Sequence, residues 1–360
     1  MTMQFRASFT SLQTGAAILS RRMTTLSLDR VDELLDRARE ARILTVGDLM
    51  LDHFLYGRVT RISPEAPVPV VEFQRETFMP GGAANVARNI TALGGQSVLF
   101  GAVGFDAAAG QLQELLSGER VECDGLLGVK NRQTTTKMRV VAGQQQITRV
   151  DRETRDELDE KSITKLIDSV TKALPKADGI VLGDYGKGVI TQRVVDSLSA
   201  ACRKQGKWLS VDPKPVHALQ LKGVSLLTPN RKEAFELAGL SDHSRTANPI
   251  EDRGLQQVAE LLMSTLSPAL LLITLGESGM LLCRRGDKPF HIPTVAQEVF
   301  DVSGAGDTVI ASFTLAVAAG ASPAEAAIFS NHAAGVVVGK LGTATVSPEE
   351  LRHSFRGDVR

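Results

Sequence analysis

Short apolar runs alternate with amphipathic stretches along most of this chain. The apolar runs predict buried strands at Ile43–Leu51, Ser97–Val103, Gly179–Leu182, Trp208–Val211, Val224–Leu227, Ala269–Thr274, Met280–Cys283 and Phe290–Val295. The stretches between them predict helices at Val31–Glu40, Gly82–Leu93, Ala107–Leu116, Thr191–Lys204, Lys232–Ala238 and Leu255–Leu266, with two Ala-rich helices after Asp307 and Pro323. This alternation predicts an α/β fold with a doubly wound, mostly parallel sheet covered by helices on both faces.

Two segments depart from this rhythm. Residues 53–73 and 134–150 alternate polar and apolar positions, with a Pro-rich turn near Pro64 in the first and Gly143 at a turn in the second. Such alternation is typical of antiparallel strands outside the main sheet. No linker rich in Pro, Gly or Ser separates them from the rest of the chain. We therefore predict a small inserted β lid over the strand ends, where open α/β sheets bind ligands.

Composition narrows the class of protein. The 360 residues include 41 Lys or Arg and 41 Asp or Glu, a balance that favours neither a nucleic-acid nor a membrane partner. No apolar run approaches the length of a membrane span. Cys123, Cys202 and Cys283 are scattered without metal-ligand spacing, which fits reduced thiols in a cytoplasmic protein.

The first 28 residues stand apart from the predicted fold. They contain Arg6, Arg21 and Arg22 but no acidic residue. This composition fits a disordered tail, a transit peptide or a start codon placed too early, and we favour the tail. We therefore expect one domain over residues 29–360.

The segment Asp301–Asp307 carries the strongest chemical signal. It reads DVSGAGD and leads from a predicted strand into a predicted helix. Gly304 and Gly306 allow a tight turn with outward N–H groups at a helix N-terminus, where anions bind. A carboxylate in the first helical turn, at Asp307, can face an incoming hydroxyl, as phosphoryl transfer requires. Taken alone, the segment is equally compatible with a glycine-rich loop that caps a buried helix.

Four further polar clusters lie at predicted strand ends or helix starts, while no G-x-G-x-x-G or P-loop is present. Adjacent glycines allow a ligand to approach the backbone, and carboxylate or amide side chains bond sugar hydroxyls. Each cluster also has a structural reading: a turn before a helix, a solvated loop end, or an ordinary N-cap at Asn230. The clusters are Asp48–Asp52, Gly81–Arg88, Asp184–Gly188 and Thr228–Glu233.

In this order, the clusters resemble the motifs of the ribokinase or PfkB family of sugar kinases, over about residues 42–352. Gly81–Asn85 matches the first family motif, and Asp301–Asp307 matches the second, D-x-[ST]-G-A-G-D. Thr228–Glu233 and Thr274–Gly279 match the nucleotide-side motifs. Further segments are similar to the heptose-7-phosphate kinases that make lipopolysaccharide precursors: 52–70, 184–188, 212–214 and 335–343.

The resemblance implies a ribokinase-like fold and an ATP-dependent carbohydrate kinase. It implies phosphorylation of D-glycero-β-D-manno-heptose 7-phosphate at C1, with Mg²⁺ as the nucleotide's cation. It also implies a homodimer formed through the lid. Relatives often carry a C-terminal adenylyltransferase, and since this sequence ends soon after Leu351, we expect that activity on a separate polypeptide.

The resemblance also assigns roles to residues. Asp307 is implied as the base, and the N–H groups of Gly304, Ala305 and Gly306 as donors to the transferring phosphoryl group. The implied nucleotide contacts are Asn230, Glu233, Thr274, Gly276, Gly279 and Asn331, with Glu233 and Asn230 reaching Mg²⁺ through water. The implied sugar contacts are Asp52, Gly81, Gly82, Asn85 and Asp184, with Arg88, Lys187 and Lys214 as basic candidates for its phosphate. Asp301 and Ser303 are implied for a monovalent cation such as K⁺.

Two alternatives stay open from the sequence. One is another sugar kinase of the same family, such as a fructokinase, which substrate competition would distinguish. The other is a catalytically silent sugar-binding or regulatory module on the same fold. The intact Asp307 argues against the silent module.

Overall fold

A computed structural model describes residues 25–357 except 144, 216–218, 245 and 297. The predicted tail lies largely outside the described residues. Its end needs one correction, because Ser27 caps the first described helix, α2 (Leu28–Ala38), by accepting the N–H of Arg30. The prediction for that helix, Val31–Glu40, was therefore shifted toward the C-terminus.

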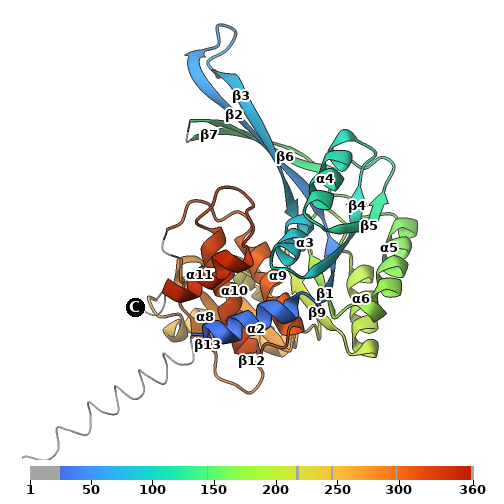
Figure 1. The fold of residues 1–360 in the computed structure, drawn as a ribbon, viewed down its shortest axis with the longest axis vertical. Coiled ribbons are helices and arrows are strands. Elements are labelled where there is room, and N and C mark those ends of the chain that lie inside the picture. The colour runs from blue at the N-terminus through green and yellow to red at the C-terminus, as the bar shows by residue number, and fades with distance from the viewer. Residues whose placement is uncertain (1–24, 144, 216–218, 245, 297, 358–360) are drawn as a thin grey trace, which may run out of the picture.

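The main sheet has nine strands, and its parallel part confirms the predicted fold class (Figure 1). Its order is β13-β12-β11-β10-β9-β8-β1-β4-β5, parallel from β11 to β5 and antiparallel at the β12 and β13 edge. The strands are β1 (Arg42–Gly47), β4 (Gln96–Val103), β5 (Glu122–Gly128), β8 (Gly179–Gly183), β9 (Trp208–Asp212), β10 (Leu226–Leu227), β11 (Leu270–Thr274), β12 (Met280–Arg284) and β13 (Phe290–Ile292).

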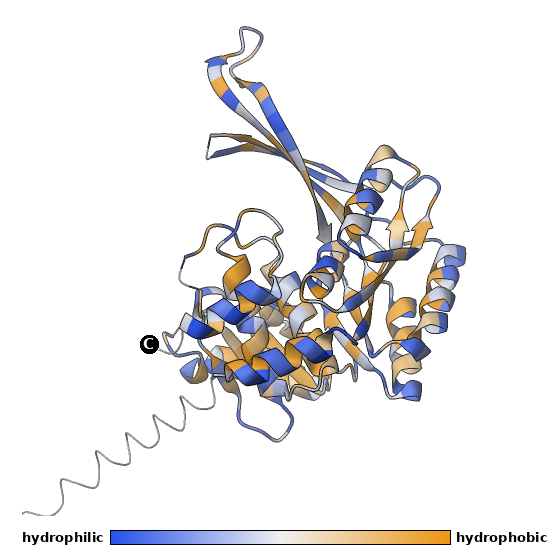
Figure 2. Cartoon of the chain, viewed as in Figure 1, coloured by the Kyte–Doolittle hydropathy of each residue, from blue (hydrophilic) through white to orange (hydrophobic). Residues whose placement is uncertain are grey.

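Helices cover both faces of this sheet because its strands are apolar on both sides. In β1, Ile43 belongs to one apolar cluster, whereas Leu44 and Val46 belong to the other. The face of Leu44 is covered by α5 (Glu160–Ala173), α6 (Gln192–Gln205), α7 (Arg231–Ala238) and α8 (Arg253–Thr265). The face of Ile43 is covered by α2, α3 (Ala83–Ala92), α9 (Ala305–Ala318), α10 (Pro323–Val337) and α11 (Pro348–Gly357). Figure 2 shows the apolar residues gathered between these layers.

A second, four-stranded sheet projects from the body (Figure 1). Its order is β3-β2-β6-β7, with β2 (Leu49–Ile62) antiparallel to β3 (Pro69–Gly82) and parallel to β6 (Thr135–Ala142), which pairs with β7 (Gln145–Arg152). These strands contain the two segments for which antiparallel strands were predicted. The predicted first strand, Ile43–Leu51, is in fact two strands that separate at Asp48, where the chain leaves the main sheet.

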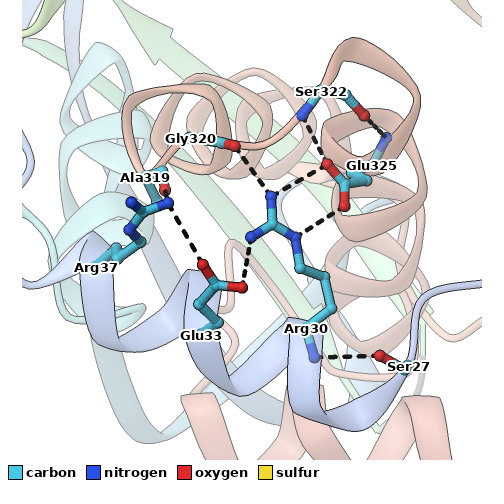
Figure 3. Close-up of polar contacts among 8 residues, drawn as sticks. All are labelled: Ser27, Arg30, Glu33, Arg37, Ala319, Gly320, Ser322 and Glu325. Atoms are coloured by element: carbon cyan, nitrogen blue, oxygen red, sulfur yellow. Dashed lines mark hydrogen bonds and ion pairs between the residues drawn. The ribbon is translucent and has the colours of Figure 1, made fainter.

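Helix α2 is attached to the turn between α9 and α10 by one ion-pair network (Figure 3). Arg30 donates to both oxygens of Glu325, at 2.8 and 3.3 Å, and to the carbonyl of Gly320 at 3.0 Å. Glu325 also completes a capping box with Ser322 at the start of α10. The network therefore links α2 to the turn after α9 and to the first turn of α10.

Some predicted boundaries were too short, and three of the described α-helices and strands were not predicted. Helix α4 (Ala107–Gly118) extends beyond the predicted Leu116, and β5, α5 and α11 were not predicted at all. No helix in the described part of the chain is long and apolar enough to cross a membrane. The three cysteines are free thiols, as predicted.

Candidate active site

The polar clusters predicted from the sequence meet at the carboxyl ends of the parallel strands. Asp48 follows β1, Asp184 follows β8, and Asp212 ends β9. Helices α3 and α9 begin beside these strand ends, so Asn85 and Asp307 enter the same region from the opposite side. This is the edge at which open α/β sheets hold ligands.

Asp307 is a buried carboxylate held from two sides. Its Oδ2 accepts the amide N–H of Asn85 at 2.7 Å, and its Oδ1 accepts the hydroxyl of Tyr185 at 2.6 Å. Burial raises the pKa of Asp307 to about 6, while the hydrogen bonds from Tyr185 and Asn85 oppose that shift. At neutral pH the carboxylate is therefore ionised, with a pKa near the range suited to a general base.

A chain of polar contacts holds Asn85, the amide partner of Asp307, in position. Thr308 donates to the side-chain oxygen of Asn89 at 3.0 Å, and Asn89 donates in turn to Asn85. Gly304 is required beside them, since its φ is 78° and an added Cβ would lie 2.6 Å from the Asn85 amide nitrogen. The second glycine motif and the first are thus packed against each other.

The glycine loop is organised by Asp301. Its oxygens accept the N–H groups of Ser303 at 2.9 Å and of Gly342 at 3.0 Å. Burial acts to raise the pKa of Asp301, but these N–H donors outweigh it and hold the pKa below its usual value. These contacts give Asp301 a role in loop structure, whereas its predicted cation-binding role stays a prediction.

One predicted anion donor is used within the loop. The N–H of Ala305 donates to the carbonyl of Val302 at 3.2 Å. For the N–H groups of Gly304 and Gly306, the described residues provide no hydrogen-bond partner. The turn therefore presents two free donors in this conformation rather than the predicted three.

Asp48, predicted as a carboxylate for ligand hydroxyls, instead holds the loop after β8. Its carboxylate accepts the N–H groups of Tyr185, Lys187 and Val189 at 2.9, 3.0 and 3.0 Å. These three bonds shape the segment that places the Tyr185 hydroxyl on Asp307. The sequence around Tyr185 and Lys187 does not indicate this contact, because Asp48 lies far away in the chain.

The predicted sugar side lies where β2 leaves the main sheet. Asp52 is buried and pairs with Arg139 on β6. The lack of a side chain at Gly81 leaves room for the Asp52 carboxylate, since a Cβ added to Gly81 would lie 2.5 Å from an Asp52 oxygen. Gly82 has φ 59° and hands the chain to α3. Arg139 was not singled out from the sequence.

The basic residues predicted for the sugar phosphate are placed differently from one another. Lys187 is nearly buried and pairs with Glu153 at 2.7 Å. Arg88 donates to Glu119 at 2.6 Å and to the carbonyl of Thr343 at 2.7 Å, contacts that favour a structural role in place of the predicted one.

Lys214 and Asp184 also differ from their predicted contacts. Lys214 pairs with Glu233 at 2.9 Å, which places it on the predicted nucleotide side and not beside Asp52. Asp184 is buried at the end of β8, where one of its oxygens accepts the N–H of Gly186 at 2.9 Å.

The predicted nucleotide side is built around the start of α7. Asn230 and Glu233 form a capping box in which each side chain accepts the other's backbone N–H, at 2.9 and 3.0 Å. The structural reading of Asn230 as an N-cap is therefore correct. Asn230 also bridges to Thr274 at the end of β11.

The remaining predicted nucleotide residues shape nearby loops. Gly279 has φ 82°, and an added Cβ would lie 2.0 Å from the carbonyl oxygen of Ile292. Gly276 has φ 60°. Asn331 on α10 donates to the carbonyl of Pro293 at 2.8 Å.

Asp212, at the end of β9, lies between the predicted sugar side and the predicted nucleotide side of the site, within reach of the charges of Asp307 and Glu233. Burial, followed by the charges of Glu233 and Asp307, raises the pKa of Asp212 well above its usual value. No group of three carboxylate, imidazole or thiol side chains converges on one point within the described ranges.

Together these contacts place a buried carboxylate, Asp307, in the first turn of a helix whose N-terminus has N–H groups without a partner among the described residues. Such a pair can accept a proton from a hydroxyl while N–H groups stabilise charge on a transferring phosphoryl group. The roles of individual residues stay predictions.

Comparison with known proteins agrees with this geometry. The model of the pfkB family carbohydrate kinases matches residues 40–350. Among curated proteins, the chain is 43% identical over 312 residues to the Bifunctional protein HldE of Desulfatibacillum aliphaticivorans and 45% identical over 320 residues to that of Pectobacterium atrosepticum. These alignments cover 86% and 89% of this chain but only 62% and 64% of the relatives, so the chain spans less than two thirds of their length.

Solved structures share the fold at lower sequence identity. Phosphofructokinase-2 from Escherichia coli in complex with potassium superposes with a TM-score of 0.71 at 22% identity, over 89% of this chain and 99% of that one. Arabidopsis thaliana ribokinase complexed with ribose and ATP gives a TM-score of 0.67 at 20% identity, over 88% and 98%. At these identities the likeness establishes the ribokinase-like fold alone.

Proposed function

This chain belongs to the pfkB family of carbohydrate kinases, and we propose that it transfers the terminal phosphoryl group of ATP to the C1 hydroxyl of D-glycero-β-D-manno-heptose 7-phosphate. The observation that carries the kinase activity is the position of Asp307, at the first turn of α9 between Asn85 and Tyr185. The choice of a heptose 7-phosphate rests on the resemblance of four segments to heptose-7-phosphate kinases: 52–70, 184–188, 212–214 and 335–343.

In the proposed reaction, Asp307 orients the C1 hydroxyl and accepts its proton as the oxygen attacks the terminal phosphorus of ATP. The bond from that phosphorus to the bridging oxygen breaks, and ADP leaves with the electron pair. The free N–H groups of Gly304 and Gly306 face the developing negative charge. Asp52 and Asn85 bond sugar hydroxyls, as carboxylate and amide groups do. The proton moves to a base that is ionised above about pH 6.

Mg²⁺ fits the nucleotide side of this site. A Mg²⁺ ion bound to ATP neutralises phosphate charge and is commonly held by one or two carboxylates plus phosphates and water. Glu233, with Asn230, would reach it through water, since the Glu233 oxygens already accept from the N–H of Asn230 and from Lys214. The charge of Glu233 also adds to the repulsion that raises the pKa of Asp212. A cation placed there would relieve this repulsion.

The experiment that tests the proposal is steady-state kinetics with four acceptors. Heptose 7-phosphate, fructose 6-phosphate, fructose and ribose are compared by kcat/KM under identical ATP and Mg²⁺. We expect heptose 7-phosphate to give the highest value. If a neutral sugar is best, the heptose assignment fails while the kinase assignment stands, and if no acceptor consumes ATP, the silent module is the correct alternative.

We also propose that two copies associate through the second sheet. Its outer strands, β3 and β7, have unpaired edges in one copy. Large apolar side chains are exposed on this sheet, a pattern that a partner surface would cover. They are Val59, Ile62, Phe73 and Val150, with Val68 in the turn between β2 and β3.

A further inference from the structure

One face of the second sheet carries charged side chains, and two of them, Asp52 and Lys137, lie near enough to Asp307 to affect its pKa. Asp52 and Lys137 are direct partners in the parallel pairing of β2 with β6, and Lys137 is in turn the partner of Asp151 on β7. Partner residues in a sheet share one face, and so do residues two apart along a strand. Arg139 therefore lies on the same face as Lys137, and its partner on β7, Arg149, does as well.

Three neighbouring cations are paired with carboxylates. Arg139 contacts Asp52, Arg149 contacts Asp151 at 2.8 Å, and Lys187 contacts Glu153 at 2.7 Å. The pairs of Arg139 and Lys187 are partly buried, whereas the pair of Arg149 and Asp151 is exposed. The arrangement leaves these groups satisfied without a ligand.

Lys137 differs from them. Within the part of the chain that the structure describes, its ammonium group has no hydrogen-bond or ion-pair partner. Burial lowers the pKa of Lys137 although the charge of Asp52 opposes the shift, and the cations of Lys187 and Arg139 lower it further. A half-buried ammonium among other cations is unfavourable unless an anion joins it.

We propose that Lys137, flanked by Arg139 and Lys187, binds the phosphate group of the acceptor sugar. This inference rests on the proposed function, because it takes the acceptor to be a sugar phosphate. The place fits the acceptor better than ATP, since Lys137 lies on the strand beside Asp52, whereas Asn230 and Thr274 lie beyond β9 in the main sheet. In this proposal, Lys137 takes the phosphate-binding role that the sequence suggested for Arg88 and Lys214. The cationic groups of those two residues instead bind protein carboxylates elsewhere.

The test is binding measured by calorimetry without turnover. Heptose 7-phosphate, the same sugar without phosphate, and a non-hydrolysable ATP analogue are each titrated into the wild type, Lys137→Gln and Lys137→Arg. The matched control is Lys165→Gln, which removes an exposed lysine on α5. Circular dichroism and the melting temperature establish that each variant is folded.

We expect Lys137→Gln to weaken sugar-phosphate binding about 10–100-fold, the usual effect of losing one charge-assisted contact. Lys137→Arg should recover part of the loss, and Lys165→Gln should match the wild type. Binding of the ATP analogue and of the unphosphorylated sugar should change less than about twofold. An equal loss for both sugars would assign Lys137 to a hydroxyl, and a loss confined to the ATP analogue would assign it to the nucleotide; either result overturns the proposal, as does unchanged binding.

The same design separates this inference from the proposed function. If the wild type binds fructose 6-phosphate and not heptose 7-phosphate, the proposed substrate is wrong, and the Lys137 comparison is made with fructose 6-phosphate and fructose. If the wild type binds neutral sugars but no sugar phosphate, the role of Lys137 is wrong as well.

Discussion

Tyr185 donates its hydroxyl to Oδ1 of Asp307 at 2.6 Å, so the base of the proposed reaction is held by a side chain from the opposite wall of the site. Burial and the nearby Asp307 charge raise the pKa of Tyr185 well above its usual value, so the phenol stays protonated and remains the donor. Tyr185 in turn depends on Asp48, which binds the N–H groups of its loop. The ends of β1 and β8 thereby both contribute to holding one carboxylate.

The first prediction concerns Asp307→Asn. Asparagine keeps the size of the side chain and can still bond Asn85 and Tyr185, but it cannot accept a proton. We expect kcat to fall about 10²–10⁴-fold, with the binding of ATP and sugar phosphate retained. Calorimetry combined with single-turnover rates would measure this, and a near-normal kcat would remove Asp307 from the role of base.

The second prediction concerns Tyr185→Phe. The hydrogen bond from Tyr185 holds the pKa of Asp307 down against the effect of burial. Without it, Asp307 should bind its proton up to a higher pH, so the acid limb of kcat/KM should move above its wild-type position near pH 6. A purely structural role for Tyr185 would lower kcat without moving the limb, and that outcome contradicts the prediction.

The residues that support Asp307 show what sequence can and cannot predict. The glycine loop and Asn85 were found because each lies in a short continuous motif, and the α/β architecture was found because strands such as β1 are apolar on both faces. Arg139 and Lys137 were missed, and Asp48 was predicted to face a ligand and not the Tyr185 loop, because the residues that they approach are distant in the sequence. Only the pairing of β2 with β6 brings Lys137 beside Asp52. The alternation in segment 134–150 did predict strands, but not which strand they would meet.

The third prediction uses the sign of the Asp307 shift. Its folded pKa, about 6, lies above the unfolded value of 3.8, so the folded state binds the proton more tightly. The corresponding stability is present below pH 3.8 and is lost as pH rises through 6, which leaves a buried charge at neutral pH. Asp307→Asn should therefore unfold at an equal or higher denaturant concentration than wild type at pH 7.5. This advantage, on the order of 1–3 kcal/mol, should shrink toward pH 4, and a difference that does not vary with pH would refute the linkage.

The fourth prediction concerns the ion pair between Arg30 and Glu325. The hydrogen bond from Arg30 lowers the pKa of Glu325 to about 2, so its contribution is present above the unfolded pKa of 4.5 and is lost as pH falls through 2. Glu325→Gln should cost about 1–2 kcal/mol at pH 7, because Arg30 and the Ser322 cap both lose a charged partner. Urea unfolding at pH 7 and pH 3 would measure this. The exposed Arg39→Gln on the same side of the molecule is the control, and a cost as small as that of the control would show that the network does not stabilise the fold.

The last prediction concerns association through the second sheet. Phe73 and Ile62 are 61% and 60% exposed on β3 and β2, in a hairpin that extends away from the body (Figure 1). Exposed aromatic and branched side chains next to the open edge of β3 favour a partner surface that is copied by two-fold symmetry. We expect the wild type to be a dimer by light scattering at micromolar concentration, and Phe73→Asp to be a monomer. Since Phe73 is exposed and contributes little to the core, the variant should keep its helical and strand content. The exposed Phe105, which lies outside this sheet, provides the matched control Phe105→Asp, expected to remain dimeric. A monomeric wild type, or equal effects of the two substitutions, would show that this sheet does not form the interface.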